Sequence, residues 1–202
     1  MRTRSREVSI GRVEILLETA RLALRRLTEA DVDDLVALDD DPRVMRFITG
    51  GLHTPPEVVR GEFLPSVLRY YERGHGLGFW AVVERRSGSF LGWLEFRPVR
   101  YDDPAEVELG YRLRHSAWGR GYAAEGARAL IDRGFGELGV RRVFATTMTV
   151  NTASRRVMDK CGLTFVRTFF QDWPYAIEGS EQGDVEYELL KADWERRGRH
   201  AG

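Results

Sequence analysis

The sequence predicts a single α/β domain with a central mixed sheet and helices on both of its faces. Its 202 residues suit one domain of ordinary size, long enough to bury a substantial core. Along the chain, strand-like runs of alternating or β-branched apolar residues alternate with helix-like segments, in which apolar residues recur every three to four positions. Helices packed on both faces of a sheet are the economical way to bury both kinds of segment.

The first part of the chain predicts one strand and two helices. Apolar and polar residues alternate from Arg21 to Leu27, which indicates a strand, and Thr28 then offers the hydroxyl expected at a helix start. That helix should end by Asp41, because the residue before a proline disfavours helical angles. A second helix begins after Pro56, and Pro65 should kink it or divide it into two pieces.

The rest of the chain predicts alternating strands and helices. Strands are expected at residues 79–83, 90–96, 107–113, 143–150, 164–170 and 184–190. Residues 85–89 separate the first two and indicate a hairpin turn. One helix should follow the glycine-rich segment that begins at Trp118 and end near Gly136, and another should begin at Asn151. A long polar stretch, residues 171–183, joins the last two strands.

The composition bears on partners and compartment. Lysine plus arginine and aspartate plus glutamate both number 31, so the formal net charge is zero and no overall field recruits nucleic acid or a membrane. No secretory signal follows the basic start, and no apolar stretch approaches the roughly 20 residues that cross a bilayer, so a cytoplasmic protein is expected. The single Cys161 excludes an internal disulfide, and the four histidines lack metal-site spacing, so no metal is expected.

The segment from Trp118 to Gly126 predicts a phosphate-binding turn. Gly119 and Gly121 stand where a strand-like segment ends and an alanine-rich amphipathic helix begins. A turn at these glycines exposes backbone N–H groups, and the helix adds its unpaired N-terminal N–H groups and the positive end of its dipole. A side chain at either glycine would keep the backbone from a phosphate or forbid a positive φ. Taken alone, the pattern also fits an ordinary tight turn.

The residues after this helix carry a resemblance to a known family. A strand-like run is followed by a helix that begins Asn151-Thr-Ala-Ser154. This order resembles the GNAT superfamily of N-acetyltransferases, in which a Q/R-x-x-G-x-G/A turn binds acetyl-coenzyme A and an N-x-x-(A/S) helix follows the next strand. Three further segments are similar to the branch that acetylates the N-termini of ribosomal proteins: residues 21–27, 108–113 and 187–194.

The resemblance implies a fold and an activity. The fold is the GNAT fold, a central mixed, mostly antiparallel sheet of six to seven strands with helices on both faces. The resemblance covers roughly residues 15–195, which leaves residues 1–14 as a poorly ordered N-terminal extension and residues 196–202 as a tail. The activity is that of an acyltransferase, in which a primary amine attacks acetyl-CoA directly within a ternary complex. A homodimer is left open.

The resemblance places coenzyme A on the glycine-rich turn. The expected contact residues are Trp118, Gly119, Arg120, Gly121, Tyr122 and Ala123. Trp118 stands where the family pattern has Gln or Arg, which removes one side chain and leaves the backbone donors. Arg120 is placed either to contact a phosphate or to meet solvent.

Backbone N–H groups are also expected to hold the thioester carbonyl. By resemblance these are the N–H groups of Leu109 and Tyr111, provided that their strand splays from its neighbour and leaves them unpaired. Gly110 between them suits a bulge, with an ordinary strand glycine as the alternative.

Two residues at the start of the following helix are expected to act on the bound cofactor. Asn151 is placed to hydrogen-bond the pantetheine arm, although asparagine is also a favoured helix cap. Ser154 is placed near the sulfur to assist the departing thiolate. Many family members carry a tyrosine acid four residues later, where this chain has Met158. Ser154 or a water must therefore protonate the thiolate, or free coenzyme A leaves as the anion.

A carboxylate is expected to take a proton from the acceptor amine, because amines are protonated near neutral pH. Glu106 and Glu108 share one face of a strand, and Glu108 is the first choice because it matches the acid before the Leu-Gly-Tyr segment of the family. Solvated strand carboxylates are the alternative interpretation. Glu95, Glu186 and Glu188 are rival bases.

The acceptor is the least determined part of the prediction. A protein or peptide α-amine leads, from the ribosomal-protein resemblance, and a small amine such as a polyamine, an aminoglycoside or an amino acid comes next. Succinyl-CoA is an alternative donor. Asp172 and Glu178, in the long polar stretch, are available to a cationic acceptor. The rival from another class is a non-catalytic acyl-CoA sensor, which the methionine at position 158 favours.

Overall fold

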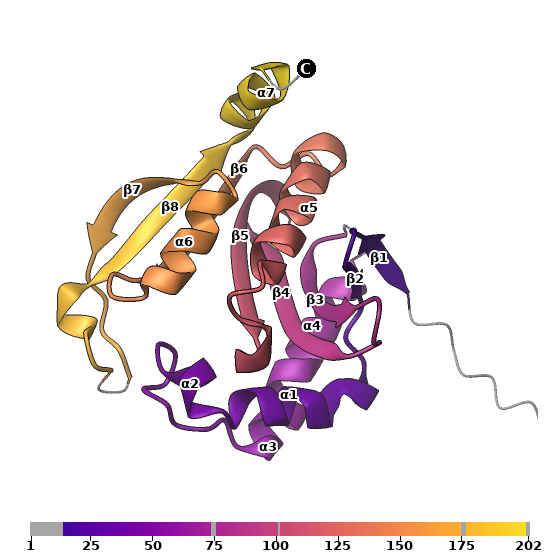
Figure 1. Cartoon of the computed structure of the whole chain (residues 1–202), viewed down its shortest axis with the longest axis vertical. Helices are drawn as coiled ribbons and strands as arrows, with labels where there is room; N and C mark the ends of the chain where they lie inside the picture. Colours follow the sequence, from indigo (N-terminus) through magenta and orange to yellow (C-terminus); the bar gives the residue numbers. More distant parts are fainter. Residues whose placement is uncertain (1–13, 74–75, 101, 175–176, 201–202) are drawn as a thin grey trace, which may run out of the picture.

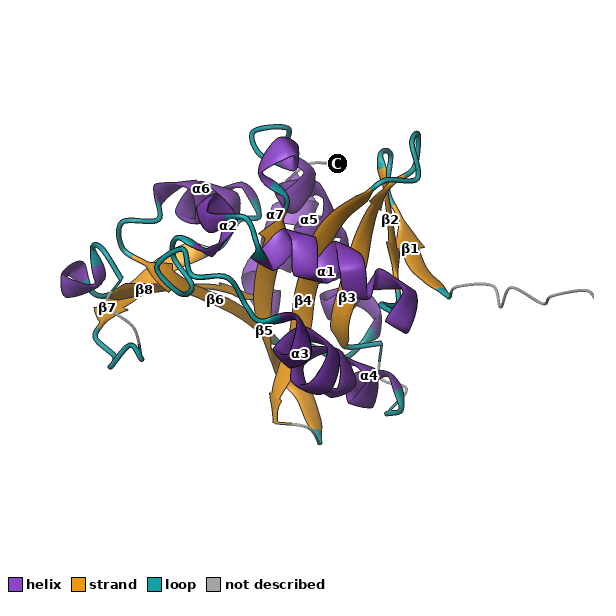
Figure 2. Ribbon diagram, turned by 90° about the horizontal axis from the view of Figure 1, so that it is seen from below, coloured by secondary structure: helices purple, strands orange, loops and turns teal. Residues whose placement is uncertain are grey.

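The computed structural model describes residues 14–73, 76–100, 102–174 and 177–200, and it contains one mixed sheet with helices on both faces (Figures 1 and 2). The expected N-terminal extension, residues 1–14, lies outside the described residues except for Glu14. Of the expected tail, residues 201 and 202 also lie outside them. The predicted fold class, a single α/β domain with the GNAT arrangement, is confirmed.

The sheet has eight strands in the order β1-β2-β3-β4-β5-β6-β8-β7. Their bounds are Ile15–Glu18 (β1), Leu22–Arg25 (β2), Gly78–Glu84 (β3), Phe90–Arg100 (β4), Asp103–Leu113 (β5), Arg142–Met148 (β6), Thr164–Phe169 (β7) and Asp184–Leu190 (β8). All neighbouring pairs are antiparallel except β5 and β6, which run parallel. The expected six to seven strands omitted β1, whose four residues show no alternation of apolar and polar side chains.

The described residues form seven α-helices, and helices pack on both faces of the sheet. Their bounds are Val32–Asp39 (α1), Pro42–Met45 (α2), Pro56–Val58 (α3), Leu64–Tyr71 (α4), Tyr122–Glu137 (α5), Thr152–Lys160 (α6) and Lys191–His200 (α7). Figure 2 shows α5 and α6 on one face and α3 and α4 on the other. None of the helices in the described part of the chain is long and apolar enough to cross a membrane. No group of three or more His, Cys, Asp or Glu side chains gathers there as a metal site would require.

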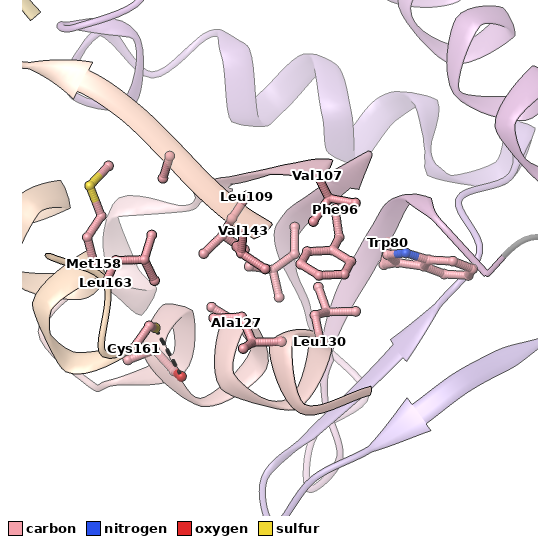
Figure 3. Packing of buried hydrophobic residues seen from close by; sticks show 14 of the residues in the cluster. Trp80, Phe96, Val107, Leu109, Ala127, Leu130, Val143, Met158, Cys161 and Leu163 are labelled. Carbon is pink, nitrogen blue, oxygen red and sulfur yellow. Dashed lines mark hydrogen bonds between the residues drawn. The ribbon is translucent and has the colours of Figure 1, made fainter. Parts of the chain in front are cut away.

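Two apolar clusters fill the space between sheet and helices, one on each face. Leu94 and Phe96 of β4 are fully buried on the side of α5, while Trp93 packs on the side of α1 and α4. The alternation follows from the two-residue period of a strand. Figure 3 shows the α5 side of the core, where Leu109 and Met158 are among the buried side chains. The even-numbered residues of β5 therefore share the α4 face with Trp93.

The helix expected after Pro56 is divided into two pieces, as the position of Pro65 indicated. A π-helical turn, Val59–Phe63, separates α3 from α4, and Pro65 is the second residue of α4. Proline has no N–H to donate to the preceding turn, so the regular ladder of hydrogen bonds cannot pass through it.

The expected bulge at Gly110 is wrong. The register between β4 and β5 runs without a shift from the Gly92–Leu113 pair to the Pro98–Val107 pair. Gly110 faces Glu95 across this ladder, and a Cβ on it would stand 2.7 Å from a Glu95 carboxylate oxygen. The glycine therefore serves to make room for a side chain of the neighbouring strand.

A C-terminal helix, α7, follows the last strand and was not expected. Trp194 donates its indole N–H to Asp132 at 2.7 Å and packs its ring 5.6 Å from that of Phe135, so α7 docks on α5. Arg197 donates to the carbonyl of Gly162 at 2.6 Å. Residue 195, the expected end of the domain, lies inside this helix.

Candidate active site

The glycine-rich turn connects the end of β5 to the start of α5. A short 3-10 turn, His115–Ala117, follows β5, and α5 begins at Tyr122. Gly119 and Gly121 have φ values of 71° and 80°, the left-handed region that glycine adopts without strain. A Cβ on Gly119 would meet nothing within 4 Å, and one on Gly121 only the Arg21 guanidinium at 3.5 Å. Backbone conformation, and not crowding within the chain, is what requires glycine here.

A run of unpaired backbone donors lies on this turn. The N–H groups of residues 119–124 make no well-aligned hydrogen bond to any other group in the described part of the chain, and the first of the helix to do so is that of Glu125, at 3.0 Å from the Gly121 carbonyl. They lie at the N-terminus of a helix of 16 residues, where the dipole is positive. The arrangement suits an anion such as a phosphate.

The turn is fixed from the side by β1 and β2. Arg21 donates to the backbone carbonyl of Arg120 at 2.9 Å. Glu125 accepts hydrogen bonds from Thr19 Oγ1 at 2.6 Å and from the Arg21 Nε at 2.6 Å. Burial raises the pKa of Glu125, but these hydrogen bonds outweigh it and lower the pKa overall. Arg21 was expected only as part of a strand, because no local pattern in the sequence indicates its contact with residue 120.

The side chains of the turn have other partners. The Tyr122 side chain is 2% exposed and its hydroxyl donates to Glu84 in the β3–β4 hairpin. The Trp118 indole donates to the Leu113 carbonyl at 2.8 Å. The Arg120 guanidinium lies 3.5 Å from Glu84 and is about half exposed. The groups of the turn that remain available to an anion are therefore its backbone N–H groups, with the Arg120 guanidinium beside them.

The strands β5 and β6 separate next to this turn. Within the described residues they pair only from Glu106–Arg142 to Glu108–Phe144, and they diverge beyond that point (Figure 1). The Ala105 carbonyl of β5 accepts from the N–H of Arg141, just before β6, whereas the N–H of Arg114, just after β5, donates to the Leu91 carbonyl of β4. The N–H groups of odd-numbered β5 residues therefore face β6. Leu109 directly follows the last paired residue, so Tyr111 has the first such N–H that lies clear of the ladder.

The side chain of Tyr111 crosses to α6. Its hydroxyl lies 2.8 Å from Ser154 Oγ and 2.8 Å from the Ser154 carbonyl oxygen. Burial raises the pKa of Tyr111 above its ordinary value, against the hydrogen bond with Ser154, so the phenol stays protonated. The sequence predicted only a backbone role for Tyr111, because nothing in it places residues 111 and 154 together.

Asn151 caps α6. Its Oδ1 accepts from the Ser154 N–H at 3.2 Å, and its Nδ2 donates to Thr147 Oγ1 at 3.0 Å. Asn151 is therefore a helix cap, as the alternative interpretation of the sequence proposed. The expected hydrogen bond between Asn151 and pantetheine stays a prediction. Met158 is 1% exposed and belongs to the apolar core (Figure 3). No titratable side chain therefore stands at that position.

The candidate bases fall into two groups. Glu106, Glu186 and Glu188 all bond the guanidinium of Arg142. Burial raises the pKa of Glu186, but hydrogen bonds from Arg167 and Arg142 outweigh it and lower the pKa overall.

The second group is Glu95 and Glu108, which bond the same guanidinium, that of Arg97. Burial raises the pKa of Glu95 to about 7, with Arg97 opposing the shift and Glu108 adding to it. Of the five carboxylates expected from the sequence, Glu95 has the side chain most suited to gaining and losing a proton near neutral pH.

A pocket of about 390 Å³ lies at the N-terminus of α6. It is lined by Arg46 and Phe47, by residues 150–153, and by Glu178, Gly179, Glu181 and Gln182. Arg46 and Glu178 approach each other to 3.4 Å across it. Of the two carboxylates expected near the acceptor, Glu178 lines this pocket and Asp172 does not. Asp184 accepts from Gln171 at 3.2 Å and from Trp173 at 3.3 Å, which holds the start of the long loop.

Comparison with known proteins identifies the class. Residues 21–164 match the model of the acetyltransferase (GNAT) domain. The FsC-acetyl coenzyme A-N(2)-transacetylase of Aspergillus fumigatus is 36% identical over 187 residues, which are 89% of this chain and 78% of that protein. The chain belongs to the GNAT acetyltransferase family. It is an acetyl-CoA-dependent N-acetyltransferase, and the resemblance of its sequence to the GNAT superfamily is confirmed, whereas the likeness to the ribosomal-protein branch stays a prediction.

Solved structures share the fold. RimL, a ribosomal L7/L12 alpha-N-protein acetyltransferase in complex with coenzyme A, superposes with a TM-score of 0.73 at 20% identity over 88% of this chain and 98% of that one. Spermidine N-acetyltransferase from Vibrio cholerae, in complex with coenzyme A and spermine, gives 0.69 at 15% identity over 87% and 99%. At these identities the likeness concerns the fold and does not choose an acceptor.

Proposed function

We propose that this enzyme transfers the acetyl group of acetyl-CoA to the primary amine of a small molecule, by direct attack within a ternary complex. The observation that carries the donor half is the run of unpaired N–H groups at residues 119–124, beside the separation of β5 from β6. The turn would hold the pyrophosphate, and the Tyr111 N–H would face the thioester carbonyl. Acetyl-CoA supplies the activated acyl group, and the chain orients it.

The pocket at α6 supports the acceptor half. Its volume of about 390 Å³ is in the range of sites for small ligands. Two carboxylates, Glu178 and Glu181, and one guanidinium, that of Arg46, line it, so an acceptor with further polar groups would find partners. The relative with 36% identity is named for an N(2) amine, which favours a small-molecule acceptor over a protein.

A protein N-terminus is the second candidate. Residues 108–113 and 187–194 resemble the ribosomal-protein branch, and a chain end would enter the same pocket. A protein N-terminus and a small molecule such as an amino acid amide offer the same attacking group, an α-amine with a pKa of about 8.

A competition experiment decides between the acceptors. The enzyme is given acetyl-CoA with equal concentrations of an α-amino acid amide, a polyamine, an aminoglycoside and N-terminally varied peptides, and the acetylated products are identified by mass spectrometry. We expect acetylated small amines to dominate. Acetylation of the peptides alone would replace the small-molecule acceptor with a protein N-terminus. A parallel reaction with succinyl-CoA should give less product than acetyl-CoA.

A further inference from the structure

Two carboxylates, Glu95 and Glu108, bond one guanidinium on the face of the sheet that carries α1 and α4. Arg97 Nε bonds Glu95 and Arg97 Nη2 bonds Glu108. The Glu95 side chain is 14% exposed and that of Glu108 is 24% exposed. A single guanidinium neutralises one carboxylate, so the pair as a whole has one negative charge more than its partner and favours uptake of a proton.

Gly110 lets the carboxyl of Glu95 lie against the backbone of β5. The two residues are opposite each other in the register, and a Cβ on Gly110 would stand 2.7 Å from Glu95 Oε2 and 3.3 Å from its Cβ. Gly110 directly precedes Tyr111, whose N–H is the first on this side of β5 to lie clear of the ladder with β6. The Glu95 carboxyl is therefore next to the stretch of β5 where the thioester carbonyl is expected.

Charged groups on three elements surround Glu95. Arg97 on its own strand and Arg112 on β5 lower the pKa of Glu95, and Glu108 on β5 raises it. Arg112 is itself held by Asp39 of α1 at 2.6 Å. Tyr70 of α4 raises the pKa of Arg97 through an electrostatic interaction. Burial is the largest influence, and together these groups give the carboxyl a pKa of about 7.

We propose that Glu95 is the carboxylate that takes the proton from the acceptor amine, and that Arg97 and Glu108 are its positioning residues. This proposal rests on the proposed transfer to an amine. The ammonium form of the acceptor gives one proton to the Glu95 carboxylate, and the freed nitrogen lone pair forms the C–N bond to the acetyl carbonyl carbon. The C–S electron pair leaves with sulfur, and the second proton lost by nitrogen ends on the thiol of coenzyme A.

The assignment differs from the one that the family resemblance gave. Glu108 matched the acid before the Leu-Gly-Tyr segment, but its carboxylate is the more exposed of the two and bonds the outer nitrogen of Arg97. Glu95 is the carboxyl that Gly110 accommodates. A base with a pKa near 7 also suits an α-amine better than an amine with a pKa above ~10. The free-energy cost of moving the proton grows with the difference between the pKa of the amine and that of the base.

Charge-neutral variants separate the two carboxylates. The pH dependence of kcat/KM is measured for the wild-type enzyme, Glu95→Gln and Glu108→Gln, with Glu137→Gln as the control because Glu137 is 69% exposed at the far end of α5. We expect an acid limb near pH 7 in the wild type and in the control. In Glu95→Gln, kcat/KM should fall by about 100-fold or more and the limb should disappear. In Glu108→Gln, the limb should persist at lower pH, because the charge that raises the pKa of Glu95 is gone.

The free protein provides a second readout. With 13C-labelled glutamate carboxyls, one resonance should titrate near pH 7, vanish in Glu95→Gln and move to lower pH in Glu108→Gln. Gly110→Ala, whose φ is not in the left-handed region, should push the Glu95 carboxyl aside and lower kcat/KM at least about tenfold with Glu95 still present. Coenzyme A affinity by calorimetry should be the same in all of these variants.

The outcomes distinguish this proposal from the function on which it rests. A Glu95→Gln enzyme that keeps the acid limb and a rate within about threefold of wild type would overturn Glu95 as the base. Loss of the limb in Glu108→Gln instead would transfer the role to Glu108. A wild-type enzyme that acetylates none of the amines would overturn the proposed function, and this proposal with it.

Discussion

Tyr111 and Ser154 bring two hydroxyl groups together where β5 and β6 diverge. The position at which the family resemblance implies a tyrosine acid is occupied by the buried Met158, so we propose that this pair or a water protonates the departing thiolate. The phenol, whose pKa burial raises, remains a proton donor through the working pH range. Its oxygen lies 2.8 Å from Ser154 Oγ, and either hydroxyl can be the donor of that hydrogen bond.

Removing either hydroxyl should slow turnover without weakening coenzyme A binding. For Ser154→Ala and Tyr111→Phe we expect kcat to fall by about 10- to 100-fold, because proton transfer to the leaving group is lost. Stopped-flow thiol release and calorimetry measure the two quantities. Thr164→Ala removes an exposed hydroxyl on β7 and serves as the control. Wild-type kcat in both variants would remove the two hydroxyls as the acid, and would mean that water protonates the thiolate or that it leaves as the anion.

At the scale of single residues, the sequence located the site better than it assigned the roles. The residue types at 151, 154 and 158 were readable because a helix start has its own signature. The Tyr111–Ser154 contact and the accommodation of Glu95 by Gly110 were not, because each joins positions far apart in the chain. Local patterns do not report which distant side chains meet. The expected role of Asn151 stays a prediction.

At the scale of elements, the start of α5 is the feature on which we expect binding of coenzyme A to depend. Gly121 precedes the helix in a left-handed conformation with φ of 80°. A β-branched residue there costs about 1–2 kcal/mol or tilts the turn, and either change redirects the unpaired N–H groups.

Gly121→Val should therefore weaken coenzyme A binding at least about tenfold, which corresponds to ~1.4 kcal/mol, while the fold is retained. Gly136→Ala is the matched control, because Gly136 lies in the same helix, has no positive φ, and would place a Cβ in open space. Isothermal calorimetry with coenzyme A gives the affinities, and far-ultraviolet circular dichroism checks the fold. Equal affinity of the Gly121→Val variant and wild type would remove the anion-site assignment.

The elements themselves were predictable where the chemistry is local. Pro65 interrupts its helix because its nitrogen has no hydrogen to donate, and the 85–89 segment forms the expected hairpin. The errors arose where tertiary contacts decide. β1 is a four-residue strand defined by its pairing with β2, and α7 is held by Trp194 against α5. Gly110 was expected in a bulge because a glycine in a strand has two physical explanations, and only the neighbouring strand chooses between them.

At the scale of the whole molecule, one parallel pair in an otherwise antiparallel sheet produces the site. The crossover from β5 through α5 to β6 makes that pair parallel, and only three residues of each strand remain paired. Beyond them the two strands diverge, with α5 on one face of the sheet and α4 on the other (Figures 1 and 2). Donor contacts follow from this shared architecture. We expect acceptor choice to depend on the loops around the pocket, and for this reason the sequence predicted a class of reaction and left the amine open.

We propose that the acetyl group passes directly from acetyl-CoA to the amine, with no acetylated enzyme as an intermediate. Cys161 is a poor nucleophile for the alternative, because burial raises the pKa of its thiol to about 12 and the thiol faces the Ala124 carbonyl within the core.

The direct test is a reaction with acetyl-CoA carrying a 13C-labelled acetyl group, followed by intact mass of the protein and of the amine, with and without the acceptor mixture. We predict unmodified protein and negligible thiol release without an amine, and labelled amide equal to the thiol released when the amine is present. Tight binding of coenzyme A with no labelled amide from any amine, or labelled protein formed before the amine is added, would contradict the account.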